Sequence, residues 1–229
     1  MKIFDSVAQM KLATIKAGQY VETFGYYTKG DAGAARYLVV ASQAADGYGD
    51  HTLANGTVAV LQNGDELPAA AQYGLLNDDS TDNKAGLTAV DARGGCKFTT
   101  GTYQIHSDTT LTGQYVFAGG ILKPLNNTVT ITMSKKPTAG QIQCFDISTG
   151  GLFKVAAVHN FDLVESIWFG MTPDDTSESI AKQNMRAIAL AAFMCNLGAT
   201  PLGSGVTPTT MLPVGIFTID DWEASGVGA

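Results

Sequence analysis

Two clusters of aspartate and hydroxyl residues are the candidates for chemistry in this sequence. They are Asp78-Asp79-Ser80-Thr81-Asp82 and Asp174-Asp175-Thr176. Hydrolysis of a glycosidic bond needs two carboxyl groups roughly 5 to 10 Å apart, one of them raised in pKa to act as an acid. Both clusters, however, stand just before a predicted helix, where short side chains cap backbone amides and favour the helix dipole. We therefore interpret them as structural and assign no catalytic residue.

The other polar residues lack the spacing that a known chemistry requires. Gly203-Ser204-Gly205 has neither the full G-x-S-x-G pattern nor the preceding apolar strand of a nucleophile elbow. Three aspartates interspersed with glycines do not match a calcium loop, and three histidines are scattered along the chain. These residues are Asp46, Asp50 and Asp65, and His51, His106 and His159. We expect no metal site and no cofactor.

Composition limits the partners and the environment. The 229 residues carry a formal charge of -7, which argues against a nucleic-acid surface because such surfaces depend on Lys and Arg. Cys96, Cys144 and Cys195 never form a C-x-x-C pair, so we expect reduced, mostly buried thiols. No signal peptide is apparent, and the longest apolar run, Ala187 to Cys195, is too short to span a bilayer. We expect a soluble protein made in the cytoplasm, with no membrane partner.

The elements that position these residues are mainly strands. Residues 1–67 predict a short helix containing Val7, Met10 and Leu12, then a small β module. Its expected strands are Tyr20–Phe24, Arg36–Val40 and Thr57–Leu61. The loop Thr28–Gly33 offers glycines for positive φ, and Asn63-Gly64-Asp65 predicts a turn.

Residues 68–164 predict short strands at roughly ten-residue intervals. The expected runs are 97–99, 102–105, 115–117, 120–122, 128–132 and 142–146. Val129, Ile131 and Met133 alternate with threonines, which buries one face only. Such spacing fits either a β-sandwich or a short solenoid, and spacing alone does not decide between them.

Residues 165–229 contain the strongest helix signal. Asp175 is a good N-cap with Glu178 three residues on, and Gly198 is placed as the C-terminal stop. A loop over 199–210 leads to a strand at Val214–Ile219. The helix is expected to cover the open end of a β-helix, where it hides backbone groups that would otherwise recruit a strand.

A pattern of an aromatic-Gly step, paired aspartates, an Ala-rich stretch and a second Gly-aromatic step occurs twice, over Tyr73 to Ile105 and over Trp168 to Ile219. With Gly119-Gly120-Ile121-Leu122-Lys123-Pro124 and Cys144-Phe145-Asp146, it resembles the front end of bacteriophage tailspike proteins. Residues 25–37 are similar to the particle-binding domains at the N-terminus of the same proteins. The resemblance covers nearly the whole chain, and the order of the three segments carries more of it than any single motif.

The resemblance implies small β modules in series, leading to the capped start of a right-handed, pectate-lyase-like parallel β-helix. It also implies a homotrimer that attaches to a phage tail or baseplate protein, docks other tailspikes, and resides in the virion. Sparse charge and many apolar residues favour an oligomer independently. The long β-helix that carries the family's catalytic carboxylates is absent, so we expect a truncated, non-enzymatic fragment whose host polysaccharide is bound by the missing part.

Two alternatives stay open. The first is a polysaccharide depolymerase active in its own right. The second is a carbohydrate-binding module that stacks exposed aromatics, Tyr26, Tyr27 or Tyr48, on sugars, although these residues equally suit a module core or a trimer interface.

Overall fold

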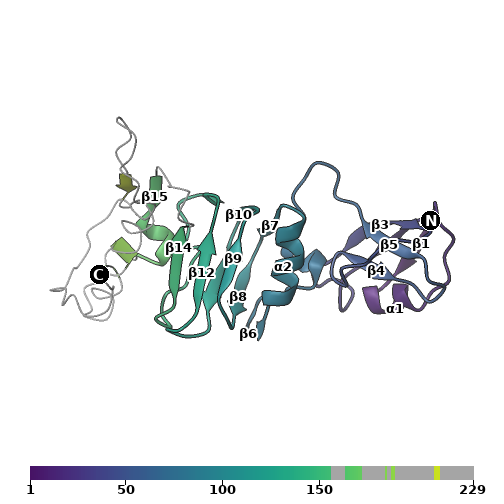
Figure 1. Cartoon of the computed structure of the whole chain (residues 1–229), viewed down its shortest axis with the longest axis horizontal. Helices are drawn as coiled ribbons and strands as arrows, with labels where there is room; N and C mark the ends of the chain where they lie inside the picture. The colour runs from purple at the N-terminus through teal and green to yellow at the C-terminus, as the bar shows by residue number, and fades with distance from the viewer. Residues whose placement is uncertain (156–162, 172–183, 185–186, 189–208, 212–229) are drawn as a thin grey trace.

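The computed structural model describes residues 1–155, 163–171, 184, 187–188 and 209–211 (Figure 1). The chain is elongated, with a small sheet at the N-terminal end and a stack of parallel strands beyond it. The described part of the chain is mainly β and includes the short α-helices α1 (Val7–Lys11) and α2 (Lys84–Ala92).

The N-terminal sheet has the strand order β1-β2-β3-β5-β4. Its strands are β1 (Lys2–Phe4), β2 (Tyr20–Thr23), β3 (Ala35–Val40), β4 (Asp50–Thr52) and β5 (Val58–Leu61). β1 pairs with β2 in parallel, and the other neighbours are antiparallel. The three strands expected from the sequence are confirmed, and they are joined by the short edge strands β1 and β4.

Alternation along the strands places the core on one face of this sheet. Val21, Tyr37 and Val39 are fully buried, and Val7 and Met10 of α1 are buried with them. Ser6 begins α1 by accepting a hydrogen bond from the Gln9 N–H at 3.4 Å. Leu12 was expected in the apolar stripe but is 81% exposed, because α1 ends one residue before it.

In the loop before β3, one of the two expected glycines has a positive φ, and the other is required for a different reason. Gly30 has φ +89°, as expected, but the other positive φ belongs to Ala32. Gly33 is required for another reason: a Cβ there would lie 2.6 Å from Cβ of Tyr26 and 2.7 Å from the Ala71 carbonyl oxygen. Gly64 has φ +59°, which confirms the turn expected at Asn63-Gly64-Asp65.

Residues 68–155 wind through three parallel sheets, with strand orders β13-β10-β7, β11-β8-β6 and β14-β12-β9. A 3-10 turn, η1 (Ala70–Tyr73), and α2 precede most of the stack. Its strands are β6 (Asp78–Asp82), β7 (Gly95–Phe98), β8 (Gly101–Ile105), β9 (Thr109–Leu111), β10 (Gln114–Phe117), β11 (Gly120–Pro124), β12 (Thr130–Met133), β13 (Thr138–Ala139) and β14 (Leu152–Val155).

The register identifies this region as coils stacked on one another. Gly95 pairs with Gln114, Gly101 with Gly120, and Thr109 with Ile131, so each strand contacts the one that follows roughly twenty residues later. A β-sandwich would need antiparallel neighbours, so the pairing supports the solenoid alternative. Within the stack, parallel pairing begins at Ala69, which bridges to Lys97, well before the residue-165 start expected for the β-helix.

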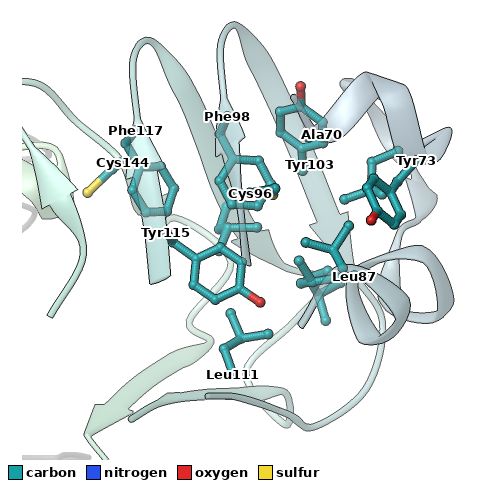
Figure 2. Close-up of a cluster of buried hydrophobic side chains, with 14 of the residues drawn as sticks. Ala70, Tyr73, Leu87, Cys96, Phe98, Tyr103, Leu111, Tyr115, Phe117 and Cys144 are labelled. Carbon is teal, nitrogen blue, oxygen red and sulfur yellow. The ribbon is translucent and has the colours of Figure 1, made fainter. Parts of the chain in front are cut away.

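Aromatic side chains fill the interior of the stack from coil to coil. Phe98 stacks on Phe117 with ring centroids 5.1 Å apart, and Phe117 meets Phe145 edge-on at 5.4 Å. Figure 2 shows Phe98 and Phe117 with Cys96 and Tyr115 in this interior. Val129, Ile131 and Met133 are buried as expected, whereas the predicted strand at 142–146 is reduced to a single bridge between Phe145 and Leu122.

The later elements are described in part. β15 (Leu163–Glu165) pairs in parallel with β16 (Thr209–Met211), so the end of the expected 199–210 loop is a strand. Trp168 and Phe169 lie buried in η2 (Ser166–Phe169). Within the helix expected over 175–198, Asn184, Ala187 and Ile188 are helical. The rest of that helix and the strand expected at 214–219 lie outside the described residues.

Candidate functional site

The first acidic cluster forms β6, an edge strand beside β8. Asp78 pairs with Thr102 and Asp82 with Gln104, so the residues between them form a bulge opposite a single residue of β8. Asp79 stands in this bulge with φ +55°, a conformation that aspartate tolerates better than most residues. The bulge therefore displays the acidic residues on the outer face of the sheet.

Asp78 and Asp82 are held by local backbone groups. Asp78 Oδ1 accepts the N–H groups of Ser80 at 3.0 Å and Thr81 at 2.8 Å, and bonds from Thr81 above all lower the pKa of Asp78 to about 2. Asp82 Oδ1 accepts from the Lys84 N–H at the start of α2 and from the His106 N–H on the next coil. The expected capping is thus found at Asp82, whereas Asp78 stabilises its own turn and Asn83 is the N-cap residue.

Asp79 is the carboxylate of this cluster that forms an ion pair with another coil. Its Oδ2 lies 2.9 Å from Nζ of Lys123 on β11, and Oδ2 of Asp146 lies 3.4 Å from the same nitrogen. The hydrogen bond to Asp79 and the charge of Asp146 raise the pKa of Lys123 although partial burial opposes them. A lysine held in its charged form between two carboxylates offsets part of their negative charge and is a poor general base.

A second polar group lies on the neighbouring strand. His106 Nε2 is 2.7 Å from Oε1 of Gln104, and Lys84 Nζ donates to Oγ of Ser107 at 2.9 Å. Sequence reasoning treated His106 as isolated and did not single out Lys123 or Asp146 with the acidic cluster. The signal available was a lysine inside an otherwise apolar strand, but its partners depend on which coils stack.

Several other aspartates of the described chain accept hydrogen bonds from backbone N–H groups of turns. The Asp31 carboxylate accepts four backbone N–H groups, from Tyr26, Tyr27, Thr28 and Gly33, at 2.7 to 2.9 Å. Burial raises the pKa of Asp31, but these four bonds outweigh it and the net shift is downward.

Asp46 and Asp91 also accept hydrogen bonds from several backbone N–H groups. Asp46 Oδ1 accepts three successive N–H groups at 2.8 Å, those of residues 48–50. Asp91, on α2, accepts from the N–H and hydroxyl of Thr112, the N–H of Gly113 and the hydroxyl of Tyr115. Each of these carboxylates therefore satisfies backbone amides that would otherwise be unpaired.

Arg93 connects α2 to the N-terminal sheet. Its Nε lies 3.1 Å from Asp46 Oδ2, and its Nη2 bonds to Oδ2 of the buried Asp50. Asp50 also accepts the Leu61 N–H. The aspartates considered for a calcium loop therefore hold a guanidinium, apart from Asp65, which lies exposed in a turn.

The three tyrosines considered for stacking on sugars, Tyr26, Tyr27 and Tyr48, also lie where the N-terminal sheet meets the first coil; we call this contact the joint. Tyr27 is 51% exposed, but its hydroxyl donates to the Gly74 carbonyl at 2.7 Å. Tyr26 and Tyr48 are half-buried and pack against the main core. A Cβ at Gly74 would lie 2.4 Å from the Tyr26 ring, so the ring and the turn after η1 are in close contact. Their geometry suits packing between the sheet and the first coil.

His51 is the most buried histidine described. It is 1% exposed on β4, with the rings of Tyr26 and Tyr37 each 5.7 Å away and no hydrogen-bond partner for either ring nitrogen in the described chain. Burial, with a smaller contribution from Lys11, lowers its pKa to about 4. His51 is therefore neutral near pH 7, and His159 lies outside the described residues.

The described residues contain no group of three or more His, Cys, Asp or Glu side chains that could hold a metal ion. No helix among them is long and apolar enough to cross a membrane. Cys96 and Cys144 are buried, as expected, and burial raises the pKa of the Cys96 thiol. Cys195, Asp174-Asp175-Thr176 and Gly203-Ser204-Gly205 lie outside the described part of the chain.

The fold defines a mainly-β protein in which a small mixed sheet is joined to stacked parallel strands. No protein-family model and no curated protein matches the sequence. Among solved structures, the chain is similar to a glycan biofilm modifying enzyme, WceF of Pantoea stewartii, described as having a bacteriophage tailspike-like parallel β-helix fold. The identity is 11% and the TM-score 0.46, over 67% of this chain and 28% of the neighbour.

Proposed function

We propose that this chain is a structural attachment region of a phage tailspike. In this proposal it forms a homotrimer, docks onto a tail or baseplate protein in the virion, and supports the part of the spike that binds and degrades host polysaccharide. It also offers a surface for other tailspikes. The chain itself performs no catalysis and binds neither nucleic acid nor membrane.

The observation that carries this proposal is the joint between the N-terminal sheet and the first coil. Arg93 reaches back from α2 to Asp46 and Asp50, and Tyr27 donates to the carbonyl of Gly74. Asp50 is 1% exposed, so its carboxylate is buried at this contact, whereas the Arg93 side chain is 33% exposed. A joint with these contacts couples the sheet mechanically to the stack, which is what an anchor requires.

The state of the carboxylates supports a structural role over catalysis. A glycosidase needs one carboxyl raised in pKa and a second free to act. Asp78 has its pKa lowered by turn hydrogen bonds, and Asp79 shares Lys123 with Asp146. The resemblance of residues 25–37 and 101–146 to tailspike sequences supplies the particular kind of anchor.

Light scattering and a binding assay test the anchor directly. We expect the purified chain to be a trimer and to be retained by tail or baseplate proteins of the phage that encodes it. A monomer that binds none of these proteins would overturn the proposal.

A polysaccharide assay tests the depolymerase alternative. We expect no release of reducing ends from purified host polysaccharides by the wild-type chain. Release that is lost in both Asp79→Asn and Asp146→Asn would instead place a catalytic pair at Lys123. Glycan-array binding that is lost in Tyr27→Ala would favour the carbohydrate-binding alternative.

A further inference from the structure

Two Asn-Gly steps occur in the N-terminal 67 residues, Asn55-Gly56 and Asn63-Gly64. An asparagine followed by glycine is open to attack of the next backbone nitrogen on its own side-chain carbonyl carbon, because glycine has no Cβ to obstruct the approach. The reaction needs an asparagine side chain that is free to rotate and a backbone N–H that is not held by an acceptor. In the structure the two Asn-Gly steps differ in both the freedom of the asparagine side chain and the hydrogen bonding of the glycine N–H.

The two steps share their glycine geometry. Gly56 has φ +80° and Gly64 has φ +59°, and a Cβ at either position would meet nothing within 4 Å. Steric access therefore does not distinguish them, so that Asn55-Gly56 is a control within the same chain.

Hydrogen bonding does distinguish them. Asn55 donates from Nδ2 to the Ile15 carbonyl at 2.9 Å, and its Oδ1 accepts from the Thr57 hydroxyl at 2.9 Å. The attacking nitrogen is also held, since the Gly56 N–H donates to the Leu53 carbonyl at 2.9 Å. Asn55 must break these bonds before it can react.

Asn63 is free of such constraints. In the described chain its side chain makes no hydrogen bond, and the Gly64 N–H has no acceptor. The nearby contact is made by the Asn63 carbonyl oxygen, which accepts from the Glu66 N–H at 3.3 Å. Gly64, Asp65 and Glu66 are exposed, so water reaches the turn.

We propose that Asn63 is a site of spontaneous deamidation and that Asn55 is protected from it. The Gly64 nitrogen forms a bond to Cγ of Asn63, the bond from Cγ to Nδ2 breaks, and the amide leaves as ammonia with the proton from the Gly64 nitrogen. The product is a succinimide ring. Solvent water then opens the ring at either carbonyl and gives aspartate or isoaspartate, without any change of oxidation state.

The product changes the segment that joins β5 to η1. It adds a carboxylate beside Asp65 and Glu66, and isoaspartate also lengthens the backbone by one methylene. The change falls between the N-terminal sheet and the coils, outside the contacts of Arg93. This inference is independent of the proposed function.

Peptide mass spectrometry of the full chain, aged at mildly alkaline pH in heavy-oxygen water, tests the proposal. We expect label-bearing aspartate and isoaspartate at residue 63 to form at least about tenfold faster than at residue 55, since several hydrogen bonds hold Asn55. The label separates reaction during ageing from earlier conversion. Equal rates at the two sites, or faster reaction at Asn55, would overturn the proposal.

Two controls isolate the structural cause. In strong denaturant the two rates should converge, and a persisting difference would mean that sequence rather than structure sets it. Thr57→Val removes one bond to Asn55 and should accelerate reaction there without changing residue 63. No acceleration in a folded variant would contradict the protective role of that bond.

Discussion

At the residue scale, several aspartates in the described part of the chain act as acceptors for backbone amides. Asp31, Asp46 and Asp91 each hold several donors of a tight turn, and Asp78 holds two in its own strand. The sequence indicated that the acidic clusters are structural, and it correctly linked one of them to the start of a helix. It could not identify Lys123 as the partner of Asp79, because these residues meet only when the coils stack.

Asp31 provides a prediction for this role. Asp31→Ala leaves four backbone N–H groups in the turn without their acceptor, so we expect a loss of about 2–4 kcal/mol in the free energy of unfolding. Urea denaturation followed by circular dichroism measures it. Asp65→Ala, at an exposed turn residue, should stay within about 0.5 kcal/mol of wild type. Equal effects of the two changes would show that the Asp31 bonds add little.

The lowered pKa of His51 predicts how the free energy of unfolding depends on pH. Its pKa is lowered from 6.5 to about 4, so the unfolded chain binds the proton more tightly than the folded protein does. The contribution of neutral His51 to the free energy of unfolding is complete above pH 6.5 and is lost as the pH falls toward 4. This loss amounts to about 3 kcal/mol in total. The charged and titratable groups around the ring are Lys11, Asp46, Tyr26 and Tyr37.

The variant His51→Phe keeps the ring contacts with Tyr26 and Tyr37 and removes the titrating group. We expect its unfolding free energy to vary less with pH than that of wild type across this window. Urea titrations at several pH values would measure the difference. Parallel pH profiles for the two proteins would contradict the assignment of the acid sensitivity to His51.

At the element scale, glycines determine how closely successive coils approach. Gly95 of β7 pairs with Gln114 of β10, and a Cβ at Gly95 would lie 1.8 Å from the Gln114 carbonyl oxygen. Gly94 has a similar φ, +99° against +115°, but a Cβ there would meet nothing within 4 Å. The high glycine content indicated tight turns, and the register shows which glycines are required by contact rather than by conformation.

These two glycines form a matched pair for mutation. Gly94→Ala should cost about 1–2 kcal/mol from backbone strain alone. Gly95→Ala carries similar strain and also forces β7 and β10 apart, so it should cost more than about 4 kcal/mol. Chemical denaturation measures the free energy of unfolding of both variants. If Gly95→Ala does not fold, the yields of soluble protein are compared instead. Similar behaviour of the two variants would mean that the coils adjust without cost.

The individual strands were largely predictable from the sequence, whereas their partners were not. Period-two alternation predicted β12, since it reflects the burial of one face, and short strand-forming runs predicted β2, β3 and β8. The run at 142–146 was also predicted as a strand but forms a single bridge, between Phe145 and Leu122. Propensity reports whether a segment suits a sheet, and register with a distant neighbour determines whether it becomes a strand.

At the scale of the whole molecule, Arg93 joins the N-terminal sheet to the coils. Arg93→Met leaves the buried Asp50 without its charged partner, although Asp50 keeps its bonds from Leu61 and Gln43. We expect about 2–4 kcal/mol of destabilisation, confined to the N-terminal sheet. In calorimetry the single transition of wild type should separate into two, and proteases should cleave first between residues 61 and 70.

A charge-conserving change completes this test. Arg93→Lys keeps the positive charge but cannot contact Asp46 and Asp50 with a rigid planar group, so its effect should be intermediate. A single transition in Arg93→Met, with unchanged protease sensitivity, would show that other contacts suffice to couple the sheet to the coils.

The sequence by itself determined the mainly β composition, the positions of most strands and turns, the burial of Cys96 and Cys144, and the link between the first acidic cluster and the start of α2. These depend on local propensity and on burial patterns a few residues long. The tertiary structure alone decided that residues 68–155 form parallel stacked coils, that Asp79 and Asp146 share Lys123, and that Arg93 joins the sheet to the stack. Such pairings bring together residues roughly twenty or more positions apart, and the choice among them rests on the packing of the whole interior rather than on any single segment.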